Sequence, residues 1–80
     1  MIEVFKTDVH RRLQARRLVN LLTRHFPGSK INFDLDDCDR ILRVEGINVK
    51  VEKIIVLLKE RGFYCKVLDD IIKARELNTK

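Results

Sequence analysis

The stretch KINFDLDDCDRILRVEG, residues 30–46, determines the fold of this chain more than any other. Hydrophobic and polar residues alternate cleanly over residues 30–36, a period of two that is typical of a strand with one buried face. The residues on the inward side are Ile31, Phe33 and Leu35. The acidic run 36–39 is typical of a turn, and residues 40–45 read as the returning strand. This segment therefore predicts an antiparallel hairpin.

A helix is predicted on either side of this hairpin. Before it, Thr7 or Asp8 is expected to cap a helix that runs to about His25. After it, Asn48 is expected to cap a second helix that ends at Arg61. Apolar residues recur at helical spacing in both segments, so each helix is expected to bury one face. These residues are Ala15, Leu18, Val19, Leu22 and Phe26 in the first helix, and Val51, Ile54, Ile55 and Leu58 in the second.

Two further strands, over residues 2–6 and 63–68, complete the pattern. The order strand–helix–strand–strand–helix–strand, with right-handed crossovers, predicts an α+β fold of the ferredoxin-like βαββαβ type. It has a four-stranded antiparallel sheet with two helices on one face. Eighty residues allow one small domain, which we place at residues 1–68. Residues 69–80 are expected to be a C-terminal tail that forms a short helix or frays.

The composition excludes several classes of protein. Hydrophobic residues make up 45% of the chain and charged residues 36%, which is too apolar for a disordered protein and too charged for a membrane span. Two cysteines are too few for a disulfide scaffold, and no signal-peptide pattern is visible up to Thr7. We therefore expect free thiols, a reducing cytoplasmic location and no membrane partner.

The sequence contains no constellation of residues that is typical of an enzyme. It has no Ser-His-Asp or Cys-His arrangement and no glycine-rich phosphate loop, so we expect no catalytic residue and no cofactor. Cys65 lies on the inward face of the last strand and is expected to pack as a small hydrophobic residue. The topology brings His10 toward the turn that carries Cys38. An alternative hypothesis is therefore a copper or zinc site that uses His10 and Cys38.

Basic residues gather in the first helix, where Arg11, Arg12 and Arg16 are expected to be exposed. The helix dipole disfavours cations in a first turn, and like charges four residues apart repel each other. This cluster is therefore the most unusual feature of the chain. Its functional interpretation is contact with an acidic protein or with a phosphate backbone. The net charge of +5 by itself is poor evidence for nucleic-acid binding.

Two aromatic residues, Phe5 and Tyr64, are expected on the open face of the sheet beside Ile41 and Leu68. Exposed apolar residues on a sheet face often mark an interaction surface, here for a protein partner or a second copy. The third predicted strand lacks the aromatic pattern with which RNA-binding domains of this architecture stack bases. Weak nucleic-acid binding through the Arg-rich first helix is therefore kept as the second alternative.

The second half of the chain resembles the heavy-metal-associated (HMA) domain family, to which copper chaperones belong. The resemblance rests on RILRVEG at residues 40–46, on RGF at residues 61–63, and on the apolar positions Ile54, Leu57 and Leu58. It extends over residues 2–68 and implies the same fold. The family's Met-x-Cys-x-x-Cys metal loop corresponds to VHRRLQ at residues 9–14, where Arg11 and Gln14 take the two thiolate positions. Because soft metals require sulfur donors, the resemblance implies a degenerate member without the usual metal site. Its expected function is protein–protein interaction.

Overall fold

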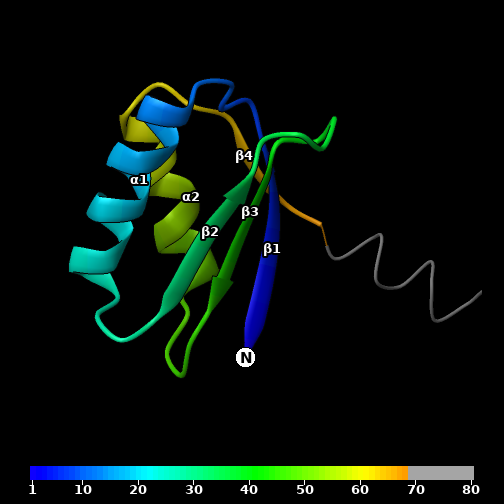
Figure 1. The fold of residues 1–80 in the computed structure, drawn as a ribbon. Helices are drawn as coiled ribbons and strands as arrows, with labels where there is room; N and C mark the ends of the chain where they lie inside the picture. Colours follow the sequence, from blue (N-terminus) through cyan, green and yellow to red (C-terminus); the bar gives the residue numbers. More distant parts are fainter. Residues whose placement is uncertain (69–80) are drawn as a thin grey trace, which may run out of the picture.

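The computed structural model describes residues 1–68 (Figure 1). In chain order the elements are β1 (Ile2–Thr7), α1 (Arg12–His25), β2 (Lys30–Asp34), β3 (Ile41–Glu45), α2 (Val51–Glu60) and β4 (Cys65–Val67). The strands form one antiparallel sheet in the order β2-β3-β1-β4, and both helices cover the same face. The predicted α+β class is thus confirmed, whereas the predicted tail lies outside the described residues. Neither described helix has the length and hydrophobicity that a membrane crossing requires.

The two central strands, β1 and β3, decide which side chains enter the core. Phe5 of β1 lies directly opposite Leu42 of β3, and Leu42 in turn lies opposite Phe33 of β2. Residues that are directly opposite in a sheet point to the same face. Phe5 is therefore fully buried under the helices, and its expected place on the open face is wrong. The buried sheet residues Phe5, Leu42 and Val44 form the centre of the core.

The helices bury most of the residues that the sequence predicts, while Val19, Val51 and Ile55 are only half-buried. In α1 the buried residues are Ala15, Leu18 and Leu22, and Phe26 follows them at the C-cap. In α2 they are Ile54, Leu57 and Leu58. Pro27 and Gly28, with a φ of +86° at the glycine, turn the chain after α1, and Gly62 does the same after α2 with a φ of +88°. The predicted end of α1 at His25 is confirmed, and α2 ends at Glu60, one residue before the predicted Arg61.

Both helices begin later than the sequence predicts. α1 starts at Arg12 with Arg11 as its N-cap, and no side chain caps it, because Thr7 and Asp8 bind elsewhere. α2 starts at Val51 with Lys50 as its N-cap, two residues after the expected cap Asn48. Val49 lies between them and is buried, so the chain stays extended until its side chain has reached the core.

The strands are shorter than predicted at the ends that meet the turns. β2 ends at Asp34 instead of residue 36, and β4 covers only Cys65–Val67 of the predicted residues 63–68. β3 starts at Ile41 because Arg40 adopts a φ of +47° and closes the hairpin turn. The Arg40 guanidinium donates a hydrogen bond to the Leu35 carbonyl oxygen across this turn. The turn therefore extends beyond the acidic run 36–39 by one residue on each side, Leu35 and Arg40, which the sequence predicts to belong to the strands.

The placement of Phe5 can be tested by unfolding. Phe5→Ala is expected to lower the free energy of unfolding by about 3 kcal/mol or more, because it leaves a cavity in the core. Ile2→Ala, on the same strand but 54% exposed, is expected to cost about 1 kcal/mol or less. Urea titration followed by circular dichroism measures both. Phe5→Leu replaces Phe5→Ala if the alanine variant does not fold. Equal losses of unfolding free energy at Phe5 and Ile2 would contradict the observed register of β1.

Candidate functional site

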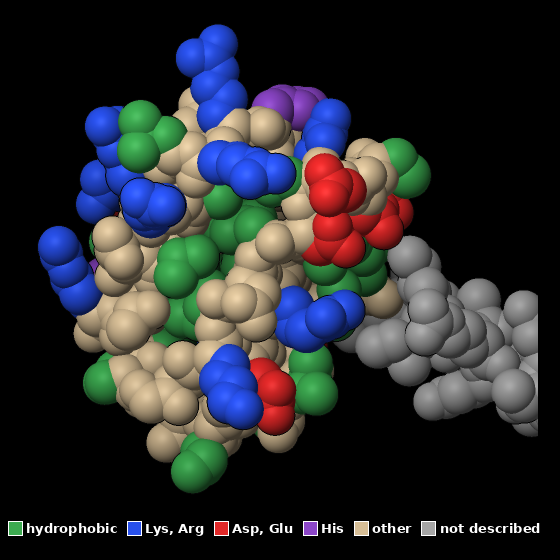
Figure 2. Space-filling model, viewed as in Figure 1, with side chains coloured by type: hydrophobic (Ala, Val, Ile, Leu, Met, Phe, Trp, Pro, Cys, Tyr) green, Lys and Arg blue, Asp and Glu red, His purple; other side chains and the backbone are tan. Residues whose placement is uncertain are grey.

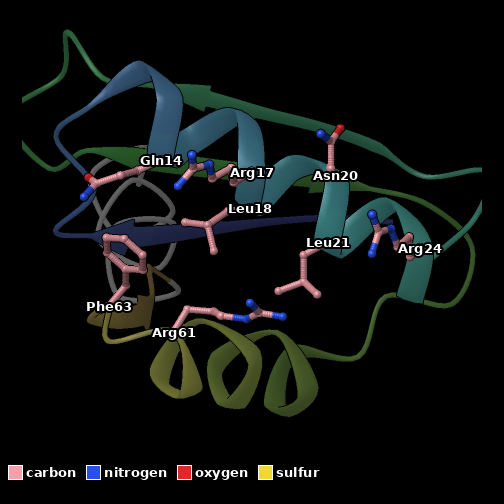
Figure 3. A pocket seen from close by; sticks show the side chains of 8 residues that line it. All are labelled: Gln14, Arg17, Leu18, Asn20, Leu21, Arg24, Arg61 and Phe63. Carbon is pink, nitrogen blue, oxygen red and sulfur yellow. The ribbon is translucent and has the colours of Figure 1, made fainter.

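A groove of about 490 Å³ runs between the two helices on the outer side of the helical layer (Figure 3). Its lining combines three guanidinium groups, two amides and an apolar floor. The lining residues are Gln14, Arg17, Leu18, Asn20, Leu21, Arg24, Arg61 and Phe63. No acidic side chain of residues 1–68 lines it. The groove therefore has the chemistry of a site for a negatively charged, partly apolar ligand.

The helical geometry places these groups together. Arg17 and Arg24 are seven residues apart, so they lie two turns apart along the same side of α1. Leu18 and Leu21 point from α1 toward α2 and separate the two helices (Figure 3). Arg61 follows the last residue of α2, and its side chain extends back into the space between the helices. Arginines from two elements that are distant in the sequence thus face one groove.

The turn after α2 fixes the other end of the groove. Gly62 has a positive φ, and this conformation reverses the chain directly after Arg61. The backbone N–H of Phe63 then donates to the Leu58 carbonyl oxygen at 2.9 Å. This bond holds the half-buried Phe63 ring against the core and at the mouth of the groove. The position of Phe63 in the lining is therefore held by backbone geometry.

The three guanidinium groups have no carboxylate partner among residues 1–68. The one ion pair of this part of the chain joins Lys6 to Asp39 at 3.5 Å, on the opposite layer. An arginine side chain presents a planar set of donors that matches a carboxylate or phosphate in two-pronged geometry. Arg17, Arg24 and Arg61 are therefore available to bind an anionic group.

The basic residues that the sequence singles out lie outside this groove. Arg11, Arg12 and Arg16 are all exposed, and none of them lines the groove. Arg12 lines a separate hollow between α1 and β2. The sequence does contain a signal for Arg17 and Arg24 in their spacing of seven. Arg61 could not be linked to them, because only the packing of α2 beside α1 brings it there.

The open face of the sheet carries fewer aromatic residues than expected. Tyr64 is 50% exposed, as predicted, but Phe5 lies in the core. The strand alternation instead places Ile2 and Val4 on the open side of β1. Ile41 and Leu68 are half-buried. The predicted pair of Phe5 and Tyr64 therefore does not form one surface.

The loops at one end of the sheet are joined through Thr7. Its buried hydroxyl donates to the Arg40 carbonyl oxygen at 2.6 Å and accepts the Val9 N–H at 3.2 Å. Beside it, the Asp8 carboxylate accepts the Tyr64 N–H at 2.7 Å. These bonds connect the β1–α1 loop to the hairpin turn and to the start of β4. The expected approach of the loop after β1 to the hairpin turn is confirmed.

The hairpin turn brings Cys38 together with two carboxylates. Ligand atoms of Asp37, Cys38 and Asp39 lie within 4.8 Å of one another, and within residues 1–68 His10 does not belong to this group. Both carboxylates already have partners, since Asp37 accepts the Asp39 N–H at 2.8 Å and Asp39 pairs with Lys6. The formation of the turn explains the cluster. The combination of His10 with Cys38 thus receives no geometric support.

The stretch 9–14, which the resemblance aligns with the HMA metal loop, carries other chemistry in the structure. Val9 is fully buried, Arg11 is the exposed N-cap of α1, and Gln14 lines the helical groove. A guanidinium group repels a metal cation and offers it no lone pair. The residues at the two thiolate positions therefore do not fit a soft metal ion.

The thiol of Cys65 has a strongly raised pKa. Burial raises the pKa of the Cys65 thiol to about 12, and the nearby Asp8 carboxylate adds to the effect. Its side chain packs against the core, which confirms the prediction of a small hydrophobic role. Cys38, by contrast, is exposed at the turn. The two thiols therefore differ sharply in environment.

Comparisons of the chain with protein-family models, curated proteins and solved structures gave no match. The assignment of function therefore rests on the residues and their geometry.

The link through Thr7 gives a prediction for stability. Thr7→Val keeps the shape of the side chain but leaves the Val9 N–H and the Arg40 carbonyl oxygen without their buried partner. We expect the free energy of unfolding to fall by about 1–3 kcal/mol. Thr7→Ser retains the hydroxyl, so its free energy of unfolding is expected to fall less than that of Thr7→Val. Urea titration checks both variants, and an unchanged midpoint for Thr7→Val would contradict the role of this hydroxyl.

The environments of the two thiols give a prediction for reactivity. With a pKa near 12, Cys65 holds almost no thiolate at pH 8, so alkylation is expected to be about a hundredfold slower at Cys65 than at exposed Cys38. Mass spectrometry of tryptic peptides after timed iodoacetamide treatment measures the ratio of the two alkylation rates.

The raised pKa of Cys65 also predicts a pH dependence of stability. The free energy of unfolding is unaffected by this thiol below pH 9 and falls as the pH rises from 9 toward 12, since only the unfolded thiol ionises there. Cys65→Ala is expected to remove this part of the pH dependence.

Proposed function

We propose that this chain is a non-enzymatic binding module that recognises an acidic helix of a partner protein in the groove between α1 and α2. One observation carries the proposal. Three arginines face one groove that no carboxylate of residues 1–68 lines, and no acidic residue of this part of the chain pairs with them. A surface that served only solubility would not need to collect its cations around an apolar floor.

The apolar floor favours a protein helix over a nucleic acid. Leu18, Leu21 and Phe63 offer contacts for the hydrophobic side chains of an amphipathic helix, which binds grooves through anchors at positions i, i+3 and i+7. Glutamates on the flanks of such a helix would reach Arg17, Arg24 and Arg61. Single-stranded nucleic acid would instead need aromatic platforms for stacking, and this groove has one ring, that of Phe63.

The proposal extends to the origin of the module. The strand order β2-β3-β1-β4, with both helices on one face, supports a ferredoxin-like fold. Together with the resemblance over residues 40–46 and 61–63, it supports descent from the HMA domains. In this reading the ancestral metal loop has become the start of a helix that contributes Gln14 and Arg17 to the groove.

The groove can be tested with a designed probe. We suggest a fluorescent 20-residue peptide with leucines at helical spacing and glutamates elsewhere, and a lysine counterpart as the negative control. The glutamate peptide is expected to bind and to shift the NMR signals of Leu21 and Phe63. The triple variant Arg17→Gln, Arg24→Gln, Arg61→Gln is expected to weaken binding about tenfold or more, because each exposed charge pair contributes up to about 1 kcal/mol.

A matched variant separates the groove from the overall charge. Arg11→Gln, Arg12→Gln, Arg16→Gln removes an equal number of positive charges, from the N-cap and first turns of α1, outside the groove. It is expected to change binding less than about threefold. Equal losses in the two triple variants would contradict the groove as the site. Tighter binding of single-stranded RNA than of the peptide, with a steep salt dependence, would favour the nucleic-acid alternative.

A further inference from the structure

Within residues 1–68, the edge of the sheet at β2 has a row of backbone hydrogen-bonding groups without partners. In an antiparallel pair, opposite residues alternate between those that exchange both hydrogen bonds and those that exchange none. The Gly46 N–H donates to the Met1 carbonyl oxygen at 3.0 Å, in line with the β1–β3 register. By alternation, Val44 and Leu42 also direct their backbone groups toward β1. Glu45, Arg43 and Ile41 direct theirs toward β2.

This alternation decides which groups of β2 are free. Lys30, Asn32 and Asp34 lie opposite Glu45, Arg43 and Ile41, so their backbone groups are used inside the sheet. The N–H and C=O groups of Ile31 and Phe33 therefore point away from β3. Because β2 is the last strand on this side, they face the outside of the described sheet. A regular strand edge without proline or a bulge is a template for another strand.

The sequence of β2, KINFD, is complementary to itself when two copies run antiparallel. A two-fold axis at Asn32 places Ile31 of each copy opposite Phe33 of the other copy. These two pairs are the ones whose free backbone groups exchange hydrogen bonds, which gives four bonds between the chains. The same register places Lys30 of each copy opposite Asp34 of the other, which gives two ion pairs. These are pairs without mutual backbone hydrogen bonds, in which the side chains approach most closely.

The space beside this edge fits the side chains that such pairing adds. A hollow of about 420 Å³ lies between α1 and β2, and its apolar lining includes Ala15, Val19 and Phe33. Figure 2 looks onto this side and shows hydrophobic surface in a depression between the helix and the sheet. Val19 and Phe33 are only half-buried within one copy. The helix-facing Ile31 and Phe33 of a second copy would cover this surface.

The other edge of the sheet, at β4, is not complementary to a second copy of itself. β4 is three residues long, and its central residue is Lys66. A two-fold axis there would place Lys66 opposite itself, which is unfavourable. The charge pattern thus distinguishes one edge from the other.

We propose that two copies of this chain pair through β2 in antiparallel orientation, with the two-fold axis at Asn32, to form one continuous eight-stranded sheet. The occupant of the edge is a second copy because both the charges and the free backbone groups of β2 match those of the same strand reversed. This pairing uses surfaces that the helical groove does not involve.

Charge exchange tests the register. Light scattering coupled to size-exclusion chromatography is expected to show a dimer at about 100 µM. Lys30→Asp alone and Asp34→Lys alone each convert two attractive pairs into two repulsive ones. We expect each to raise the dissociation constant about 30-fold or more. The double variant Lys30→Asp, Asp34→Lys is expected to restore the dimer. Lys66→Asp, the same charge change on the other edge, is expected to leave it intact.

Mixing the two single variants gives the sharpest outcome. One variant then carries two acidic residues on β2 and the other two basic residues, so the mixture is expected to form a heterodimer although each variant alone is monomeric. Circular dichroism of each variant controls for folding. A monomeric wild-type chain at about 1 mM would overturn the proposal. So would a dimer that tolerates both single variants, or one that is lost in Lys66→Asp.

Discussion

The pairing of β1 with β3 is the constraint on which the other features depend. These two strands occupy the centre of the sheet, and their register places Phe5, Leu42 and Val44 on the face that the helices cover. A shift by one residue would exchange the two faces of β1 and expose Phe5. The same pairing leaves β2 and β4 as the two edges. It thereby determines which backbone groups of β2 are free and over which strands α1 lies.

The sequence predicts the order of the elements well but leaves the orientation of β1 open. In β2 the apolar and polar residues alternate strictly, so its inward side is unambiguous. In β1 the outward residues Ile2 and Val4 are as apolar as the inward Phe5. Which of these residues point inward is therefore decided by the pairing of Phe5 with Leu42, which lies 37 positions further along the chain. This is why the sequence pattern favours the wrong face for Phe5.

The site was harder to predict than the fold, for two physical reasons. Residues with capping side chains were expected to start the helices, but Thr7 and Asp8 instead stabilise contacts between loops, and α1 begins without a side-chain cap. A propensity for capping does not show which hydrogen bond wins in the folded chain. The groove, moreover, is a property of two helices together. The wheel of α1 shows that Arg17 and Arg24 share a side, but Arg61 joins them only through the turn at Gly62.

The position of α1 separates the two surfaces that we assign to binding. The side of α1 that faces α2 carries the charged groove residues, among them Arg17 and Arg24. The side that faces β2 carries Ala15 and Val19 and borders the free edge. The two sets of lining residues have no member in common. Binding of an acidic helix and pairing of two copies are therefore compatible in one molecule, and the loss of either leaves the physical basis of the other unchanged.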